Sequence, residues 1–427
     1  MLDIKLIREN TNFVKQDLTK RNDQEKLAWV DDLLQKDEEY RKLTYSVQEL
    51  KHKKNSLNQE ISQLRKEGKD IVKKLAEMKS LPTELANAEK RMQELKEKID
   101  FYMQRLPNIL HDSVPLGKTP DDNVTVRVWG KIPKQKFTPV SHVDIIEKLN
   151  LVDLDRAAKV AGARFYYLKN ELVLMELALQ KLALDLLVKK GYQIMEVPLM
   201  ISKKAISGAI TLGDFEDVIY KIENEDLYMI ATSEHSLACY HMDETLKQEE
   251  LPLRYAGVSS CFRKEAGAHG KDTKGIFRVH QFNKVEQFIF STPEQSWELH
   301  EELIKNAEEL FQSLKLPYRI VNICTADIGS VAAKKYDLEV WMPVQGCYRE
   351  MVSCSNCTDF QSRKLNIRFG QPGAAGNPLV HTLNSTAVAT SRAIAAIIEN
   401  YQQEDGSIEV PKVLQKMMSG IKVIGKK

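Results

Sequence analysis

The sequence has few cysteines and almost no net charge. Six cysteines in 427 residues are too few to staple a secreted scaffold, so we expect reduced thiols and a cytoplasmic protein. The 62 lysines and arginines are balanced by 60 aspartates and glutamates, which leaves a formal charge of +2. The charge of the whole molecule would therefore not attract nucleic acid or a membrane, and any polyanion must bind to local basic clusters.

Long apolar runs and phosphate-loop signatures are also missing. The most apolar stretch, residues 171–190, is interrupted by Glu176, Lys181 and Asp185, so it predicts a helix of a globular core rather than a membrane span. The first ten residues alternate charged and apolar side chains and contain no signal-peptide core. Neither G-x-x-x-x-G-K-[ST] nor a G-x-G-x-x-G after a strand occurs, which excludes two common glycine-rich phosphate loops.

Residues 27–107 carry a seven-residue repeat of apolar side chains. Two runs of similar length are separated by Glu67-Gly68-Lys69, and this pattern predicts an antiparallel helical hairpin, or arm, within an N-terminal domain of residues 1–110. Pro82 interrupts the second run, so we expect a kink or a new helix start there. The repeat occupies two columns in each run: Tyr40, Val47 and Ile61 with Leu43, Leu50, Leu57 and Leu64 in the first, and Ile71, Met78, Leu85, Met92, Ile99 and Leu106 with Leu81, Ala88, Leu95 and Tyr102 in the second.

Basic side chains cluster where the predicted hairpin turns. A run of charges on a coiled coil is most often a solvated surface. The alternative is a lever that contacts phosphates along an RNA helix, which requires cations but no base recognition. The charge pattern by itself does not choose between these two interpretations. The candidate RNA-binding residues are Lys51, Lys53, Lys54, Arg65 and Lys66.

Residues 111–427 alternate strand-like and helical segments, which predicts an α+β fold with an antiparallel sheet flanked by helices. Phe282 beside arginines and carboxylates suits an adenine ring and a polyphosphate. Arg392, near the start of its helix, opposes the helix dipole and therefore favours a bound anion. Three segments carry these features: a long helix followed by a strand (171–198), two strands around a glycine-rich basic loop (255–290), and small residues that open an apolar helix (382–402).

These three segments, in this order, resemble the signature motifs of class II aminoacyl-tRNA synthetases, and with the arm in front they resemble the seryl-tRNA synthetase family. Thr232-Ser233-Glu234 is similar to the family's TxE loop, and the stretch from Tyr348 to Gln361 is similar to a strand of its catalytic core. The resemblance covers essentially the whole chain. It implies an N-terminal tRNA-binding domain followed by a class II catalytic domain over residues 111–427.

The resemblance implies an ATP-dependent serine–tRNA ligase. Serine's carboxylate would attack the α-phosphorus of ATP, and the seryl group would then pass to the 3′ end of a tRNA. The implied catalytic residues are Arg263, Arg392 and Glu286. The implied ATP-binding residues are Arg263, Glu265, Arg278, Phe282, Glu350, Ser353 and Arg392. The implied serine-binding residues are Thr232, Glu234, Arg263, Glu286, Asn384 and Thr386. Glu350 and Ser353 are also the implied ligands of Mg²⁺ or Mn²⁺, since divalent cations of this kind prefer oxygen.

The resemblance further implies a homodimer that binds tRNA(Ser) through its long variable arm and its acceptor end. It leaves open whether a selenocysteine tRNA is charged as well. Two other interpretations remain, namely a non-catalytic RNA-binding homologue and a class II paralogue that loads another carrier. Cys354 and Cys357 form a C-x-x-C for which Cys347 and His381 are conceivable zinc partners. Because the motifs resemble the zinc-free branch of the family, we expect no zinc.

Overall fold

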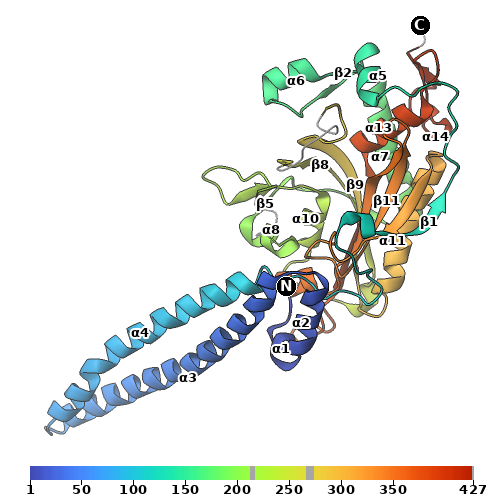
Figure 1. The fold of residues 1–427 in the computed structure, drawn as a ribbon. Helices are drawn as coiled ribbons and strands as arrows, with labels where there is room; N and C mark the ends of the chain where they lie inside the picture. Colours follow the sequence, from blue (N-terminus) through green and yellow to red (C-terminus); the bar gives the residue numbers. More distant parts are fainter. Residues whose placement is uncertain (212–216, 266–273, 426–427) are drawn as a thin grey trace. The chain divides into compact units, whose positions relative to one another are not determined.

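The computed structural model of the protein describes residues 1–211, 217–265 and 274–425. These residues form two compact units: one spans Leu2–Leu106, and the other spans Pro107–Lys427 together with Met1. Both units are coloured along the chain in Figure 1. In the described ranges no helix is long and apolar enough to cross a membrane.

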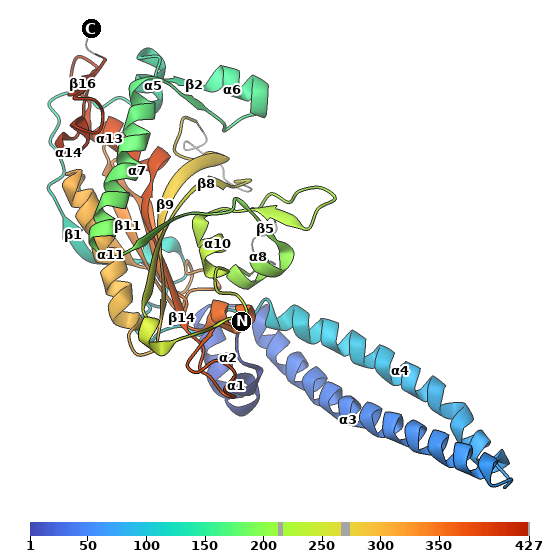
Figure 2. The same ribbon diagram turned by 180° about the vertical axis from the view of Figure 1, so that it is seen from behind.

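The N-terminal unit consists of helices only. Two short helices, α1 (Ile4–Glu9) and α2 (Thr11–Lys20), precede the long helices α3 (Gln24–Lys66) and α4 (Val72–Met103). The long helices lie side by side and run in opposite directions (Figures 1 and 2). Gly68, with φ +67°, occupies the turn between them, a conformation that glycine adopts without steric cost. The predicted two-helix arm is confirmed.

The seam of the arm follows the heptad pattern. The most deeply buried seam residues are Val47, Leu57 and Ile61 on α3 and Leu81 and Leu95 on α4. α4 continues through Pro82, so of the two outcomes expected there, a kink or a new helix start, the new start is wrong. Ion pairs between the two helices mark their register: Lys51 with Glu89, Glu39 with Arg91 and Glu60 with Lys74. These pairs are exposed and screened by solvent, so the apolar seam rather than the ion pairs holds the arm together.

The second unit is built on an eight-stranded sheet in the order β1-β10-β11-β12-β14-β9-β8-β4. All neighbours pair antiparallel except β4 and β8, which are parallel. The antiparallel character predicted from the sequence is therefore confirmed. The strands are β1 (Val124–Trp129), β4 (Gln193–Glu196), β8 (Leu253–Phe262), β9 (Gln281–Ser291), β10 (Tyr318–Asn322), β11 (Lys334–Met342), β12 (Cys347–Asn356) and β14 (His381–Ala389).

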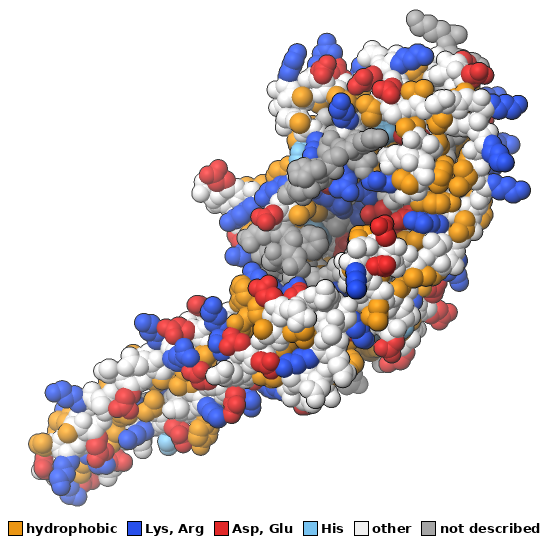
Figure 3. Space-filling model, viewed as in Figure 1, with side chains coloured by type: hydrophobic (Ala, Val, Ile, Leu, Met, Phe, Trp, Pro, Cys, Tyr) orange, Lys and Arg blue, Asp and Glu red, His pale blue; other side chains and the backbone are white. Residues whose placement is uncertain are grey.

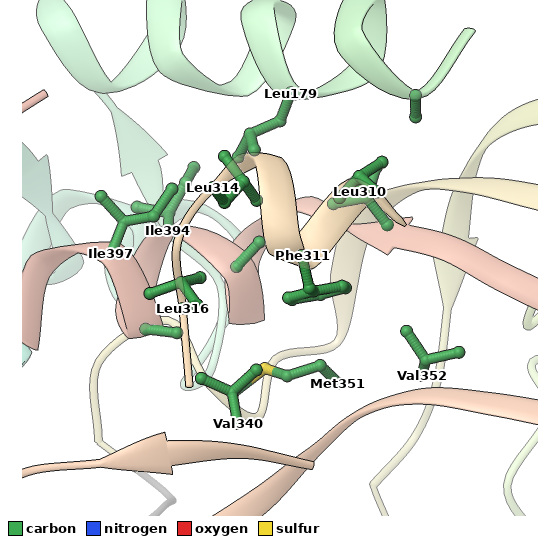
Figure 4. Packing of buried hydrophobic residues seen from close by; sticks show 14 of the residues in the cluster. Leu179, Leu310, Phe311, Leu314, Leu316, Val340, Met351, Val352, Ile394 and Ile397 are labelled. Carbon is green, nitrogen blue, oxygen red and sulfur yellow. The ribbon is translucent and has the colours of Figure 1, made fainter. Parts of the chain in front are cut away.

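Three long helices cover one face of this sheet (Figures 1 and 2). They are α7 (Glu171–Lys189), α11 (Ser296–Ser313) and α13 (Thr390–Tyr401). Figure 4 shows their apolar side chains, among them Leu179, Phe311 and Ile394, converging above Val340 and Val352 of the sheet. Because side chains alternate along a strand, this packing leaves every second side chain of the central strands for the opposite face.

Shorter elements complete the second unit. α8 (Lys203–Ala209) and α10 (Ser233–Ala238) pack on the opposite face of the sheet, where Phe288 and Phe290 join a second apolar cluster. The other helices among the described residues are α5 (His142–Lys148), α6 (Leu154–Ala161), α12 (Phe360–Leu365) and α14 (Lys412–Gln415), with 3-10 turns at Pro120–Asp122 and Gln248–Glu250. Two-stranded ribbons are formed by β2 (Val152–Asp153) with β3 (Tyr167–Leu168), β5 (Met200–Ser202) with β6 (Leu227–Met229), β7 (Thr245–Leu246) with β13 (Arg368–Phe369), and β15 (Ile408–Glu409) with β16 (Val423–Ile424).

Candidate active site

A cavity of about 340 Å³ lies on the face of the sheet that α7, α11 and α13 leave uncovered. It gathers most of the site residues predicted from the sequence, although they are scattered over more than 150 positions of the chain. The predicted residues that line it are Thr232, Glu234, Arg263, Phe282, Glu286, Glu350, Ser353, Asn384, Thr386 and Arg392.

The floor of the cavity is the central strand β9. Phe282, Lys284 and Glu286 alternate along it and all line the cavity. Their direct partners on β8 are small, which leaves room above the strand for a ligand. These partners are Cys261, Ser259 and Gly257.

Gly257 also lets helix α10 approach the sheet. A Cβ atom at this position would lie 2.8 Å from the Cβ of Ser233, closer than carbon atoms tolerate. The Ser233 hydroxyl donates a hydrogen bond to the Gly257 carbonyl at 3.2 Å. Thr232 caps α10 by accepting from the Glu234 amide at 3.3 Å. The start of α10 is thereby held against β8, and both Thr232 and Glu234 reach the cavity.

Two β-bulges bring further residues to the cavity. Glu350 and Ser353 are three apart on β12, so a regular strand would turn them to opposite faces. The pairing with β11 slips by one residue at Met351, and as a result both side chains line the cavity. A second bulge on β14 slips the pairing with β9 at Ala387, beyond Thr386, which pairs with Glu286. Both bulges lie next to the cavity.

Arg392 projects from the first turn of α13. Its guanidinium donates to the Glu350 carbonyl at 3.1 Å and lies 3.5 Å from the Glu350 carboxylate. Burial opposes the ionisation of Glu350, but Arg392 and the other cations of the cavity outweigh it and lower the pKa of this carboxyl. The side chain of Glu350 is nevertheless 44% exposed, because it faces the cavity. The Phe277 ring supports the Arg392 guanidinium at 5.4 Å.

Arg263 follows the last residue of β8. Its amide donates to the His280 carbonyl at 2.9 Å, and the His280 Nδ1 donates back to the Arg263 carbonyl at 2.7 Å, which extends the β8–β9 pairing by one step. The guanidinium donates to the Ala231 carbonyl at 3.3 Å and lies 5.2 Å from the centre of the Phe282 ring. A guanidinium and an aromatic face are thus presented together at one end of the cavity.

Glu234 is fixed by two amides. The side-chain nitrogens of Asn384 and Gln361 donate to its Oε1 at 3.1 and 3.3 Å. Gln361 is itself held in this orientation by Thr382, whose hydroxyl donates to the Gln361 oxygen at 2.6 Å. Burial raises the pKa of Glu234 to about 7, and the negative charge of nearby Glu286 adds to this effect.

Glu286 and Lys284 form a buried ion pair on β9. Their side chains are 1% and 7% exposed. The Lys284 ammonium also donates to the Thr386 hydroxyl at 3.4 Å. Burial raises the pKa of Glu286, while Lys284 and Arg263 oppose the shift.

Two predicted ATP-binding residues do not line the cavity. Strand alternation predicts Arg263 and Glu265 on one face, and this expectation is wrong because β8 ends at Phe262 and Glu265 adopts φ +48°. Its carboxylate lies 3.8 Å from the guanidinium of Arg278, the other residue outside the cavity lining. The glycine-rich part of the predicted loop, residues 266–273, lies outside the described residues.

The basic residues proposed to bind RNA all lie on the N-terminal unit, near the turn of the arm. The Lys51 ammonium pairs with Glu89 at 2.8 Å, because α4 brings this carboxylate alongside α3. Figure 3 shows basic and acidic side chains interspersed along the arm. A role of Lys53, Lys54, Arg65 and Lys66 in binding RNA stays a prediction.

The C-x-x-C pair is packed into the protein. The Cys354 thiol lies 3.7 Å from the His300 carbonyl, and the Cys357 sulfur accepts from the Asn384 amide at 3.5 Å. Among the residues that the structure describes, no group of three histidine, cysteine, aspartate or glutamate side chains could hold a metal ion.

Strand alternation predicts that Lys284 shares a face with Phe282 and Glu286, and this is confirmed, although the sequence assigned Lys284 no role. Other residues of the site were not predicted from the sequence. Lys335 lines the cavity and its ammonium lies 3.2 Å from the buried Asp337 carboxylate. Gln361, which is not part of the cavity lining, gave no local signal, because its role depends on a contact with Glu234, which is 127 residues away in the chain.

The antiparallel sheet, the cavity on the face opposite the three long helices and the arginine at the start of α13 are the features of a class II synthetase core. Residues 218–401 match the family model of the tRNA synthetase class II core domain (G, H, P, S and T), and residues 1–110 match the seryl-tRNA synthetase N-terminal domain. A prolyl-tRNA synthetase from Giardia lamblia shares this fold with a TM-score of 0.55 at 17% identity, over 64% of this chain and 54% of that chain.

More similar proteins identify the family. The serine–tRNA ligase of Methanocella arvoryzae is 52% identical over 99% of this chain and 100% of its own. The crystal structure of seryl-tRNA synthetase from Pyrococcus horikoshii complexed with ATP is 53% identical, with a TM-score of 0.91 over 99% of each chain. That of the cytoplasmic enzyme from Naegleria fowleri with AMP is 38% identical, with a TM-score of 0.85 over 99% of this chain and 98% of that chain. The chain belongs to the seryl-tRNA synthetase family.

Proposed function

We propose that the protein is a serine–tRNA ligase. It activates L-serine with ATP to give seryl-adenylate and diphosphate, and it transfers the seryl group to the 3′ end of tRNA(Ser). The observation that carries this proposal is one cavity that combines two arginines, an aromatic ring and buried carboxylates. The full-length similarity to serine–tRNA ligases supports the same activity.

Activation joins two anions, so the main task of the site is to cancel their repulsion. The serine carboxylate oxygen forms a bond to the α-phosphorus while the bond to the diphosphate oxygen breaks. In this proposal Arg263 bridges the carboxylate and the α-phosphate, and Arg392 holds the γ-phosphate. No protein nucleophile is required, because positioning and charge neutralisation supply the catalysis.

The adenine half of the ATP site is assigned to the β8–β9 hairpin. Phe282 stacks on the adenine ring, and Glu265 accepts a hydrogen bond from the adenine amino group. Arg278 contacts the triphosphate. Support for Glu265 and Arg278 comes from their neighbourhood, since their side chains lie 3.8 Å apart at the end of the same hairpin that carries Arg263.

The serine pocket is assigned to the inner end of the cavity. Glu286 binds the ammonium and the hydroxyl of serine, and Thr386 lies beside it on the neighbouring strand. Thr232, Glu234 and Asn384 complete the pocket. Alanine would leave these groups unpaired, a penalty that reaches roughly 10⁴-fold in sites that read a hydroxyl. Threonine keeps the hydroxyl and must be excluded by shape.

Glu350 and Ser353 fit a divalent cation. The cations around Glu350 keep its carboxylate ionised, and the bulge at Met351 turns the Ser353 hydroxyl to the same cavity. Two oxygen donors suffice for Mg²⁺ or Mn²⁺ when phosphate oxygens supply the other ligands. A cation bound there would neutralise part of the charge of the triphosphate.

We assign tRNA binding to the N-terminal domain, residues 1–110, and catalysis to residues 111–427. The arm would contact the long variable stem of tRNA(Ser) through phosphates, using Lys51, Lys53, Lys54, Arg65 and Lys66. Whether tRNA(Sec) is also charged can be tested by measuring the transfer of serine to that tRNA. Cytoplasmic localisation stays a prediction.

A homodimer is part of this proposal. Apolar side chains on α7 and β4 are exposed in the single chain, as expected for a surface that a second copy covers. They are Val173, Leu177, Val188 and Ile194. Sedimentation analysis of the purified protein should give a species of twice the chain mass.

Amino-acid-dependent exchange of diphosphate into ATP tests the proposed activity. Serine should support exchange, and threonine, alanine and cysteine should support far less. Absence of exchange with serine would favour the non-catalytic RNA-binding homologue. Exchange without charging of tRNA(Ser) would favour the paralogue that loads another carrier.

A further inference from the structure

Lys284 is a buried cation that lies between the residue proposed to bind adenine and the residue proposed to bind serine. Its ammonium is in contact with the Glu286 carboxylate and donates to the Thr386 hydroxyl at 3.4 Å. Although close to Lys284, Glu286 Oε2 makes no hydrogen bond of good geometry within the described residues. The lysine neutralises the carboxylate, and because a carboxylate oxygen can accept more than one hydrogen bond, Glu286 can also accept one from a ligand.

The order of side chains on β9 places Lys284 between the two halves of the site. Phe282, Lys284 and Glu286 follow one another on one face at about 7 Å intervals. In the proposed function Phe282 binds adenine and Glu286 binds the ammonium of serine. Lys284 then stands at the point where the α-phosphate and the serine carboxylate must meet, with Arg263 contributing from the end of β8.

We propose that Lys284 is a catalytic residue that changes partners during the reaction. In the empty site it neutralises Glu286. When serine binds, the substrate ammonium takes its place on Glu286, and the lysine ammonium turns to the carboxylate and the α-phosphate. This inference rests on the proposed function and assigns Lys284 a role within it.

The balance of buried charges supports this change of partners by Lys284. Glu286 is 1% exposed, and a buried carboxylate that lacks a cation is strongly destabilised, so the empty site requires Lys284. Two ammonium groups on one carboxylate would leave a buried excess positive charge, so the arriving substrate favours release of the lysine. The released cation is then next to two anions. Lys284 forms no covalent bond in this step, in which the serine carboxylate oxygen bonds to the α-phosphorus while the bond between that phosphorus and the diphosphate oxygen breaks.

The test compares Lys284→Met and Lys284→Arg with the unaltered protein in serine-dependent diphosphate exchange. Lys284→Met should lower kcat roughly 10²- to 10³-fold, the loss typical of one removed cationic or hydrogen-bonding group at a developing charge. The KM for ATP should change little, and Lys284→Arg should recover part of the rate. An unchanged kcat with only a raised KM for serine would overturn the proposal, because the lysine would then serve Glu286 alone.

Lys335→Met is a matched comparison, since Lys335 lines the same cavity and also pairs with a buried carboxylate, that of Asp337. It does not stand between Phe282 and Glu286, so its loss in kcat should be much smaller. Equal losses in both variants would contradict a specific role of Lys284.

A crystal structure of the unaltered protein with a sulfamoyl analogue of seryl-adenylate tests, without any variant, whether Lys284 changes partners. The Lys284 ammonium should lie within hydrogen-bond distance of the sulfamoyl or carbonyl oxygens and no longer on Glu286. An ammonium that remains on Glu286 in this complex would overturn the proposal. Failure of the proposed function is distinguishable, because the unaltered protein would then show no serine-dependent exchange.

Discussion

Arg263 reaches the cavity because its own backbone is paired with His280 beyond the end of β8. The Arg263→Ala variant keeps this pairing but removes the cation between two anions. We expect diphosphate exchange to fall roughly 10²- to 10³-fold or more. Arg263→Lys should recover only part of the rate, because an ammonium cannot bridge two oxygens as a planar guanidinium does. Near-normal exchange in the alanine variant would contradict the assignment of Arg263.

Glu234 should make the stability of the folded protein depend on pH. Its pKa is about 7 in the folded chain, above the ordinary value of 4.5, so between these values the folded state holds a proton that the unfolded state has released. Its contribution to stability is therefore largest below pH 4.5 and is lost as the pH rises through 7. Comparing urea unfolding of the unaltered protein and Glu234→Gln across pH 4.5–8 should show that the glutamine variant lacks this part of the decline.

The same residue should affect substrate binding. In the proposed pocket Glu234 lies near Glu286, which binds the serine ammonium, so ionisation of Glu234 adds negative charge close to that ammonium. The KM for serine should therefore fall as the pH rises through about 7, while the KM for ATP does not follow this trend. A KM for serine that is constant from pH 6 to 8 would contradict a contact between ionised Glu234 and the substrate.

The residues that were predictable and those that were not differ in how their positions arise. Phe282 and Glu286 follow from simple alternation along β9. Glu350 and Ser353 could be named only through a family resemblance, because alternation alone would separate them and the bulge at Met351 has no clear sequence signal. Gln361 acts through distant contacts that local patterns do not encode.

At the scale of elements, the packing of α10 on β8 depends on Gly257. In Gly257→Ala the new Cβ would lie 2.8 Å from that of Ser233 and 2.9 Å from Leu237 Cδ1. We expect the free energy of unfolding to fall by about 1–3 kcal/mol, as at other overpacked sites. The KM for serine should also rise, because Thr232 and Glu234 move with α10. Chemical denaturation and steady-state exchange measure the two effects.

The double variant Gly257→Ala with Ser233→Gly is the control. Removing the Ser233 side chain relieves the shorter of the two contacts, so part of the serine KM should be restored even though glycine weakens the first turn of the helix. No recovery in the double variant would show that the contact between α10 and β8 is not what positions Glu234.

Elements with a long repeat were predicted best. The heptad repeat predicts the two helices of the arm, because apolar residues at an average spacing of 3.5 positions form a continuous seam between two packed α-helices. The helix restart at Pro82 was wrong because the seam continues on both sides of the proline, at Leu81 and Leu95, and the packing of the arm outweighs one missing amide. Short ribbons such as β7 with β13 pair segments more than 100 residues apart and could not be predicted from local patterns.

At the scale of the whole molecule, the residues proposed for catalysis and those proposed for RNA binding lie in different compact units. Every residue that lines the cavity belongs to the unit that spans Pro107–Lys427. The candidate RNA-binding lysines and arginines all belong to the unit that spans Leu2–Leu106. Serine activation should therefore not require the outer part of the arm, whereas tRNA charging should.

A truncation of the arm tests this division. Deleting only residues 51–69 would leave most of α4 without its partner, so the cut should follow the register that the Lys51–Glu89 pair marks. Replacing residues 52–88 by a short glycine-rich turn keeps the inner part of the seam, including Val47 and Leu95. The rate of diphosphate exchange should stay within about twofold of that of the full chain. The kcat/KM for tRNA(Ser) should fall by orders of magnitude. It should also depend less on salt concentration, because fewer phosphates are contacted. Undiminished tRNA charging by this variant would exclude the arm as the element that binds the variable stem.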